Sequence, residues 1–141
     1  MRELVNAKEC LQSRDYTCVL CKDDKLYTST DRGVKPLVKW LASDIDFKGY
    51  YAADKVIGKA TAFLYMLLGV QEVYAGVISR TALEVFVAHG IHVEYETVVA
   101  YIKNRSGDGI CPFEAAVFDI EETEKAYEAI RLKMTEMNII I

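Results

Sequence analysis

The sequence predicts an α/β protein: a three-layer α/β/α sandwich with a five-stranded mixed sheet, folded as one domain over residues 1–141. Its composition is that of a globular domain, since 52% of the 141 residues are hydrophobic and only two are proline. Two apolar runs around an Asp-rich link near the N-terminus indicate a β-hairpin. Farther along, apolar strand-like runs alternate with helical patterns, which predicts parallel strands joined by right-handed crossovers.

The first half of the chain is expected to form a helix, a hairpin and a second helix. These elements are a helix over residues 2–13, strands over 16–21 and 26–29, and a helix over 34–42. The polar run 22–25 supplies the hairpin turn. Pro36 supports the start of the second helix, because no N–H is needed in the first turn. The hairpin should add one antiparallel strand to the sheet.

The second half is expected to alternate strands with helices. The strands are residues 50–53, 73–78 and 91–95, and the helices are residues 54–68, 80–89, 97–103, one opening at 111–114, and 120–137. Gly69 and Gly90 are expected to end the first two of these helices. Ser79 is expected to cap the helix that follows it.

The helix expected from Asp54 to Leu68 is the central element. From Thr61 onward it is apolar on nearly every side, which is typical of a helix buried all round. Its first turns carry Lys55 and Lys59, which share one face and oppose the helix dipole. Lysines at a helix N-terminus are electrostatically unfavourable, and an unfavourable placement of this kind is one signal of a functional site.

Charge and targeting patterns argue against several functions. The net charge is −4 and no basic stripe is interleaved with aromatic residues, so no nucleic-acid partner is expected. The apolar run 60–70 is too short to span a bilayer and the N-terminus does not resemble a signal peptide, which predicts a cytoplasmic protein with no membrane partner. Cys18 and Cys21 lack the second pair of a zinc ribbon and are expected to pack as small hydrophobes on opposite strand faces.

Three stretches resemble a bacterial family described as domain of unknown function 1893. They are residues 26–29 with 32–37, residues 53–60, and residues 111–114. The stretch 53–60 is the most specific, and the resemblance covers nearly the whole chain. The family has the cytidine-deaminase-like fold, whose order of elements is the order predicted here. The resemblance therefore implies that fold and a bacterial source, and it implies no particular reaction.

The residues that bind zinc in cytidine deaminases are missing. Those enzymes carry His or Cys with a glutamate at one helix start and Pro-Cys-x-x-Cys at the next, where the metal activates water. The corresponding segments here are 31–34 and 54–59, and neither contains His or Cys. The sequence therefore predicts no metal, no cofactor and no zinc-dependent deamination.

The first functional hypothesis is a site for a small anionic ligand, phosphate- or nucleotide-like, where two helix N-termini converge. Helix N-termini offer unpaired N–H groups and a positive partial charge. The expected ligand-binding residues are Ser29, Arg32, Gly33, Asp54, Lys55, Gly58, Lys59 and Arg105. Asp54 would cap the helix and pair with a lysine, and Gly58 would permit a close backbone approach. The alternative is that Asp54 is only an N-cap and the lysines are solvated.

The second hypothesis is an enzyme that uses Cys111 as a nucleophile or redox centre. Cys111 follows a glycine-bearing loop and precedes proline, which places it at a helix N-cap, where the pKa of a thiol is lowered. Glu114, at the third helical position, is a candidate base or backbone cap. These two residues, with Asp54 and Lys59, form the candidate catalytic set. The alternative is that Cys111 is a buried residue that ends the loop.

The third hypothesis is a non-catalytic regulatory module that kept the fold without the metal. The apolar tail 139–141 and the nine tyrosines would then serve a homo-oligomer. The three hypotheses stay open on the sequence alone, and so does the question whether the chain is an enzyme.

Overall fold

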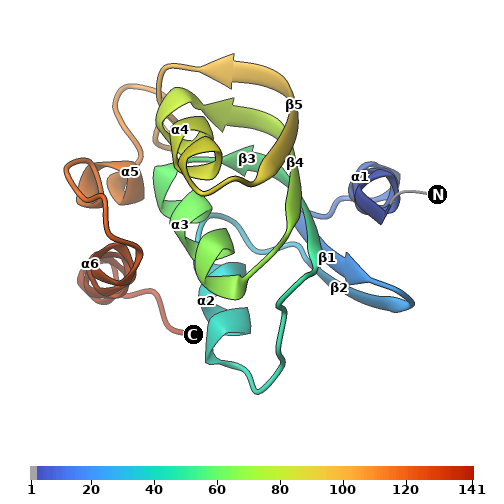
Figure 1. The fold of residues 1–141 in the computed structure, drawn as a ribbon. Helices are drawn as coiled ribbons and strands as arrows, with labels where there is room; N and C mark the ends of the chain where they lie inside the picture. The colour runs from blue at the N-terminus through green and yellow to red at the C-terminus, as the bar shows by residue number, and fades with distance from the viewer. Residues whose placement is uncertain (1–2) are drawn as a thin grey trace.

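The computed structural model describes residues 3–141 and contains one five-stranded mixed sheet with helices around it (Figure 1). The strands are β1 (Cys18–Lys22), β2 (Lys25–Ser29), β3 (Tyr51–Ile57), β4 (Glu72–Ser79) and β5 (His92–Val99). The helices are α1 (Glu3–Ser13), α2 (Lys35–Ala42), α3 (Lys59–Leu68), α4 (Arg80–Ala88), α5 (Pro112–Ala116) and α6 (Thr123–Glu136). The predicted α/β class and five-stranded mixed sheet are confirmed. Residue 2, where the first helix was expected to begin, lies outside the described residues.

The strand order in the sheet is β2-β1-β3-β4-β5. β1 runs antiparallel to both of its neighbours, and β3, β4 and β5 run parallel to one another. The hairpin pairs Lys22 with Lys25, and Asp23 in its turn has a φ of 55°. The hairpin and its single antiparallel strand are therefore as predicted.

Helices lie on both faces of the sheet (Figure 1). On one face, α1 buries Leu4, Ala7 and Leu11 against strand residues such as Val19 and Ala53. On the other face, α2, α3 and α4 lie against the sheet, and α5 and α6 lie beyond α3. α3 is the central helix, with eight of its ten residues buried. The prediction of a buried central helix is confirmed.

The start of α3 differs from the prediction. β3 continues through Asp54 to Ile57, and α3 begins at Lys59 with Gly58 as its N-cap. Asp54 is therefore a strand residue and not a helix cap. The cause is the pairing of Val56 and Ile57 with β4, which suits β-branched side chains and extends the strand.

A second difference concerns residues 97–103, where a short helix was expected. Residues 97–99 instead complete β5, because Thr97, Val98 and Val99 pair with the end of β4. The chain then crosses the end of the sheet, and only Lys103 makes a further bridge, to Ile110.

The helix caps follow the sequence. Ser79 Oγ accepts a hydrogen bond from the N–H of Ala82 at 3.1 Å, and Gly69 ends α3 with a φ of 83°. None of the helices within residues 3–141 has the length and apolar character needed to cross a membrane.

Candidate functional site

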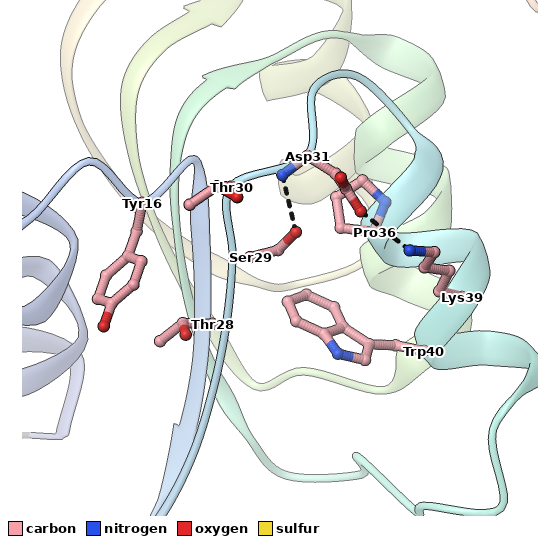
Figure 2. Close-up of a pocket in the computed structure, with 8 residues that line it drawn as sticks. All are labelled: Tyr16, Thr28, Ser29, Thr30, Asp31, Pro36, Lys39 and Trp40. Carbon is pink, nitrogen blue, oxygen red and sulfur yellow. Dashed lines mark hydrogen bonds and ion pairs between the residues drawn. The ribbon is translucent and has the colours of Figure 1, made fainter.

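A cavity of about 400 Å³ lies between β2 and the start of α2. Its lining residues are Tyr16, Thr28, Ser29, Thr30, Asp31, Pro36, Lys39 and Trp40. Figure 2 shows Ser29 and Trp40 in the space between β2 and α2, with Tyr16 and Thr28 on the other side of the strand. The cavity lies at the end of β2, an outer strand of the sheet, where Thr28 to Asp31 line it. We call this the β2–α2 cavity.

The loop between β2 and α2 is held by side-chain hydrogen bonds. Thr17 Oγ1 lies within donating distance of two carbonyl oxygens, 3.0 Å from that of Ser29 and 2.5 Å from that of Asp31. The N–H of Asp31 donates to Ser29 Oγ at 3.0 Å. Gly33 has a φ of 68°, the left-handed conformation that lets the chain turn into α2. These contacts hold the polar residues of the cavity in place without a ligand.

The β2–α2 cavity combines charge with an aromatic surface. Lys39 Nζ lies 3.1 Å from Asp31 Oδ2, and both side chains are partly exposed. Trp40 offers an indole ring that packs against Phe47 on one side. The N-cap of α2, Val34, makes no side-chain capping bond, so the first turn has no side-chain acceptor from its cap. The cavity can therefore contact the hydroxyl groups, the anionic groups and a flat apolar ring of one ligand at the same time.

A row of polar side chains leads from this cavity across three neighbouring strands. Ser29 of β2 is directly opposite Cys18 of β1, and Cys18 is directly opposite Asp54 of β3. Directly opposite residues point to the same face of a sheet, with Cβ atoms about 5 Å apart. Ser29 lines the cavity, whereas Cys18 and Asp54 are buried behind it.

Asp54 is a buried carboxylate held by a neighbouring tyrosine. Tyr65 Oη of α3 donates to Asp54 Oδ2 at 2.6 Å, and the N–H of Val56 donates to Oδ1 at 3.1 Å. Burial raises the pKa of Asp54 from 3.8 to about 7, because removal from water disfavours the charged form. Burial and the charge of Asp54 also raise the pKa of the Cys18 thiol well above its usual range. The lysine partner that was predicted for Asp54 is replaced by Tyr65.

The N-terminus of α3 is occupied by a carboxylate from the protein itself. Glu114 Oε2 accepts a hydrogen bond from the N–H of Lys59 at 2.8 Å, and Glu114 is only 5% exposed. A Cβ atom on Gly58 would lie 2.8 Å from Glu114 Oε1, so a side chain at this position would displace the carboxylate. A close backbone approach was predicted at Gly58; the group that lies close to it in the structure is the Glu114 side chain.

The two lysines of the central stretch do not point into one cleft. Lys59 Nζ lies 3.1 Å from the carbonyl oxygen of Phe118 and 3.4 Å from Glu121 Oε1, and the side chain is buried. Lys55 is exposed on β3. Of the predicted ligand-binding residues, only Ser29 lines the β2–α2 cavity, with Arg32 and Gly33 on the adjoining loop.

Cys111 is at the N-cap of α5, as predicted, and is half-buried. Its N–H donates to the carbonyl oxygen of Ile102 at 2.9 Å. Glu114, three residues later, directs its carboxylate to α3, so it is not placed as a base for the thiol. Arg105 lies exposed in a turn that is closed by hydrogen bonds between Asn104 and Asp108. The reactivity of Cys111 stays a prediction.

Cys18 of this polar row, and Tyr65 of α3, which donates to Asp54, were not among the predicted site residues. A signal existed for Tyr65, since a hydroxyl in a helix that is otherwise apolar needs a buried partner. The position of Cys18 between Ser29 and Asp54 depends on the strand register, which the sequence does not give. Within residues 3–141, no group of three or more His, Cys, Asp or Glu side chains is placed to hold a metal ion.

Comparisons with known proteins identify the family. Comparison with curated proteins gives no match. Among solved structures, the chain is similar to the crystal structure of TM1506, a DUF1893 family protein from Thermotoga maritima, with 25% identity and a TM-score of 0.84 over 96% of this chain and 91% of that chain. The family described as domain of unknown function (DUF1893) matches residues 6–134. The chain therefore belongs to the DUF1893 family.

Proposed function

We propose that this protein binds a small anionic ligand of the nucleotide class in the β2–α2 cavity. The observation that supports the proposal is the lining of that cavity, which places the Ser29 hydroxyl, a lysine and an indole ring on the α2 side of β2. Binding sites of this kind combine an apolar surface with a few fixed polar groups that orient the ligand.

Each part of a nucleotide has a suitable partner in the cavity. The indole of Trp40 is a stacking surface for a base. Asp31 is an acceptor for sugar hydroxyls, and Lys39 with the nearby Arg32 can pair with a phosphate. Because stacking on Trp40 and hydrogen bonds from the sugar to Asp31 add to the phosphate contact, a nucleoside monophosphate should bind more tightly than inorganic phosphate.

The proposal moves the site relative to the sequence-based hypothesis. The N-terminus of α3 already has Glu114 as its anion, whereas the start of α2 has no side-chain cap. The ligand is therefore assigned to the α2 side alone. The enzyme hypothesis based on Cys111 is less favoured, since Glu114 is engaged elsewhere.

The wider setting is also part of the proposal. The placement of α1 on one face and α2 to α4 on the other supports a three-layer, cytidine-deaminase-like arrangement. We also propose that the protein is bacterial, as the sequence resemblance implies, and cytoplasmic. A homo-oligomer that forms through the apolar C-terminal residues is supported by the 82% exposure of Ile140. In this proposal the protein binds its ligand without metal chemistry.

Trp40 makes the proposal directly testable, because it is the single tryptophan of the chain and lines the cavity. The experiment titrates adenosine monophosphate, adenosine and inorganic phosphate while tryptophan fluorescence is recorded. We expect a saturable change that is tightest with the monophosphate. Lys39→Ala should weaken it about tenfold, the usual value of a charge-assisted hydrogen bond. Lys125→Ala, which changes an exposed lysine of α6, should have no effect. An absence of saturable change with all three compounds would refute the proposal.

A further inference from the structure

A second hollow, of about 350 Å³, lies at the carboxyl ends of the parallel strands β3, β4 and β5. Its lining residues are Val56, Val77, Val99, Ala100, Tyr101, Ile102 and Lys103. All are apolar or aromatic except Lys103. Open α/β sheets bind their ligands at this end of the strands. We call this hollow the β3–β5 groove; it lies toward the opposite edge of the sheet from the β2–α2 cavity.

The floor of the groove is created by a break in the side-chain alternation of two strands. Asp54 contacts α3 through Tyr65, and Ile57, three residues later, also belongs to the core on that side. Residues three apart in a regular strand face opposite ways. In β4, Ala75 and Ile78 show the same irregularity.

The break is supported by a close contact between the two strands. A Cβ atom on Gly76 would lie 2.7 Å from the carbonyl oxygen of Lys55, so the strands can approach in this way only because residue 76 is glycine. Beyond the break, Val56 and Val77 point away from the α3 side of the sheet. Val56 is 46% exposed there, although valine is an apolar residue suited to burial.

One wall of the groove is the segment 100–103, and hydrogen bonds hold it in place. The N–H of Ile102 donates to Glu114 Oε1 at 3.4 Å, and its carbonyl oxygen accepts from the N–H of Cys111 at 2.9 Å. Lys103 then bridges to Ile110. The groove is therefore formed before any ligand arrives, which reduces the entropic cost of binding.

The charge at the groove is positive, although the chain carries a net charge of −4. Lys103 is exposed, and within residues 3–141 no carboxylate lies within ion-pairing distance of its ammonium group. No acidic residue is among those that line the groove. We propose that the β3–β5 groove binds a small amphipathic carboxylate, with its apolar body on Val56 and Val77 and its carboxylate on Lys103. This site is separate from the nucleotide-class site.

The experiment uses 1-anilinonaphthalene-8-sulfonate as a fluorescent reporter and displaces it with octanoate, octanol or octylamine. We expect one saturable reporter site from which octanoate displaces the dye at least fivefold more effectively than octylamine. Lys103→Glu should weaken octanoate about three- to fivefold, since the ion pair is exposed. Val56→Glu should weaken it more than tenfold, because it removes apolar contact and adds a repelling charge.

Two variants serve as controls. Val87→Glu changes a valine of α4 that is 66% exposed and lies outside the groove, and Lys39→Ala changes the β2–α2 cavity; both should leave octanoate binding unchanged. Circular dichroism checks folding, and the milder Val56→Ser replaces Val56→Glu if the latter unfolds. The proposal is overturned if no displacement saturates, if octylamine equals octanoate, or if Lys103→Glu has no effect. It is also overturned if light scattering shows a dimer that Val56→Glu dissociates, since a second copy would then cover the groove.

Discussion

Replacement of Asp54 by asparagine should make the stability of the protein less sensitive to a rise in pH from about 4 to about 7. The carboxyl group is buried, and its pKa is raised from 3.8 to about 7 by burial. Between these two values the folded state retains a proton that the unfolded state has released. The free energy of unfolding therefore falls as the pH rises through this window, and it levels off above about pH 7.

The size of the effect follows from the pKa. A rise from 3.8 to about 7, at about 1.4 kcal/mol for each pH unit, corresponds to about 4 kcal/mol over the whole window. Between pH 5 and pH 8 the free energy of unfolding should fall by about 2–3 kcal/mol of this total. An asparagine side chain does not titrate, so the Asp54→Asn variant lacks this contribution at every pH. The side-chain NH2 of the introduced asparagine cannot accept a hydrogen bond, so it leaves one of the two donors, Tyr65 or Val56, without an acceptor. This loss lowers the free energy of unfolding by an amount that does not depend on pH.

The assay is urea unfolding of the native protein and the variant at several pH values from 5 to 8. The quantity of interest is the difference between their free energies of unfolding, because titration of all other groups cancels in it. We expect this difference to move by about 2–3 kcal/mol in favour of Asp54→Asn as the pH rises. Asp44→Asn, which changes an exposed aspartate, should show no such trend. Parallel curves for the native protein and Asp54→Asn would refute the assignment of a raised pKa to this buried carboxyl.

Three further substitutions test other contacts of the same region. Tyr65→Phe removes the donor to the buried carboxylate and should cost about 1–3 kcal/mol in urea unfolding, with a larger loss at pH 8 than at pH 5; equal losses would contradict the reasoning. Gly76→Ala sets a Cβ 2.7 Å from a backbone carbonyl and should cost about 1–3 kcal/mol, whereas Gly109→Ala, whose nearest neighbour is a side-chain nitrogen at 3.4 Å, should change Tm little. Glu114→Ala leaves the start of α3 without its acceptor and should cost about 2–4 kcal/mol. Phosphate should then raise the Tm of this variant more than that of the native protein, and an equal shift would show that the start of α3 is closed to anions.

The sequence predicts the elements of the fold because their signals are local. Hydrophobic alternation, the Asp-rich turn of the hairpin and the caps at Ser79 and Gly69 each depend on a few neighbouring residues, and the structure confirms them. The end of β3 could not be located in this way. Asp54 and Lys55 are poor strand formers, and they are held in the strand by pairing with β1 and β4, which lie elsewhere in the chain.

The candidate site was harder to predict, because its contacts join distant segments. Glu114 reaches the start of α3 across 55 positions of sequence, and Lys59 reaches Glu121 across 62. Ser29, which was predicted to bind a ligand because it ends a strand next to a helix start, lines the cavity. Trp40 and Lys39 were not, because helical periodicity marks Trp40 simply as an apolar residue of α2.

The contact between Glu114 and α3 bears on how the two proposed sites relate. The same carboxylate that accepts from Lys59 with one oxygen accepts from Ile102, in the wall of the β3–β5 groove, with the other. One oxygen therefore accepts at the start of α3 and the other accepts in the groove wall. A ligand that displaced Glu114 from one of these contacts would also break the other. Glu114 closes the start of α3, so the two ligands that we propose are assigned to the start of α2 and to the far side of the groove wall.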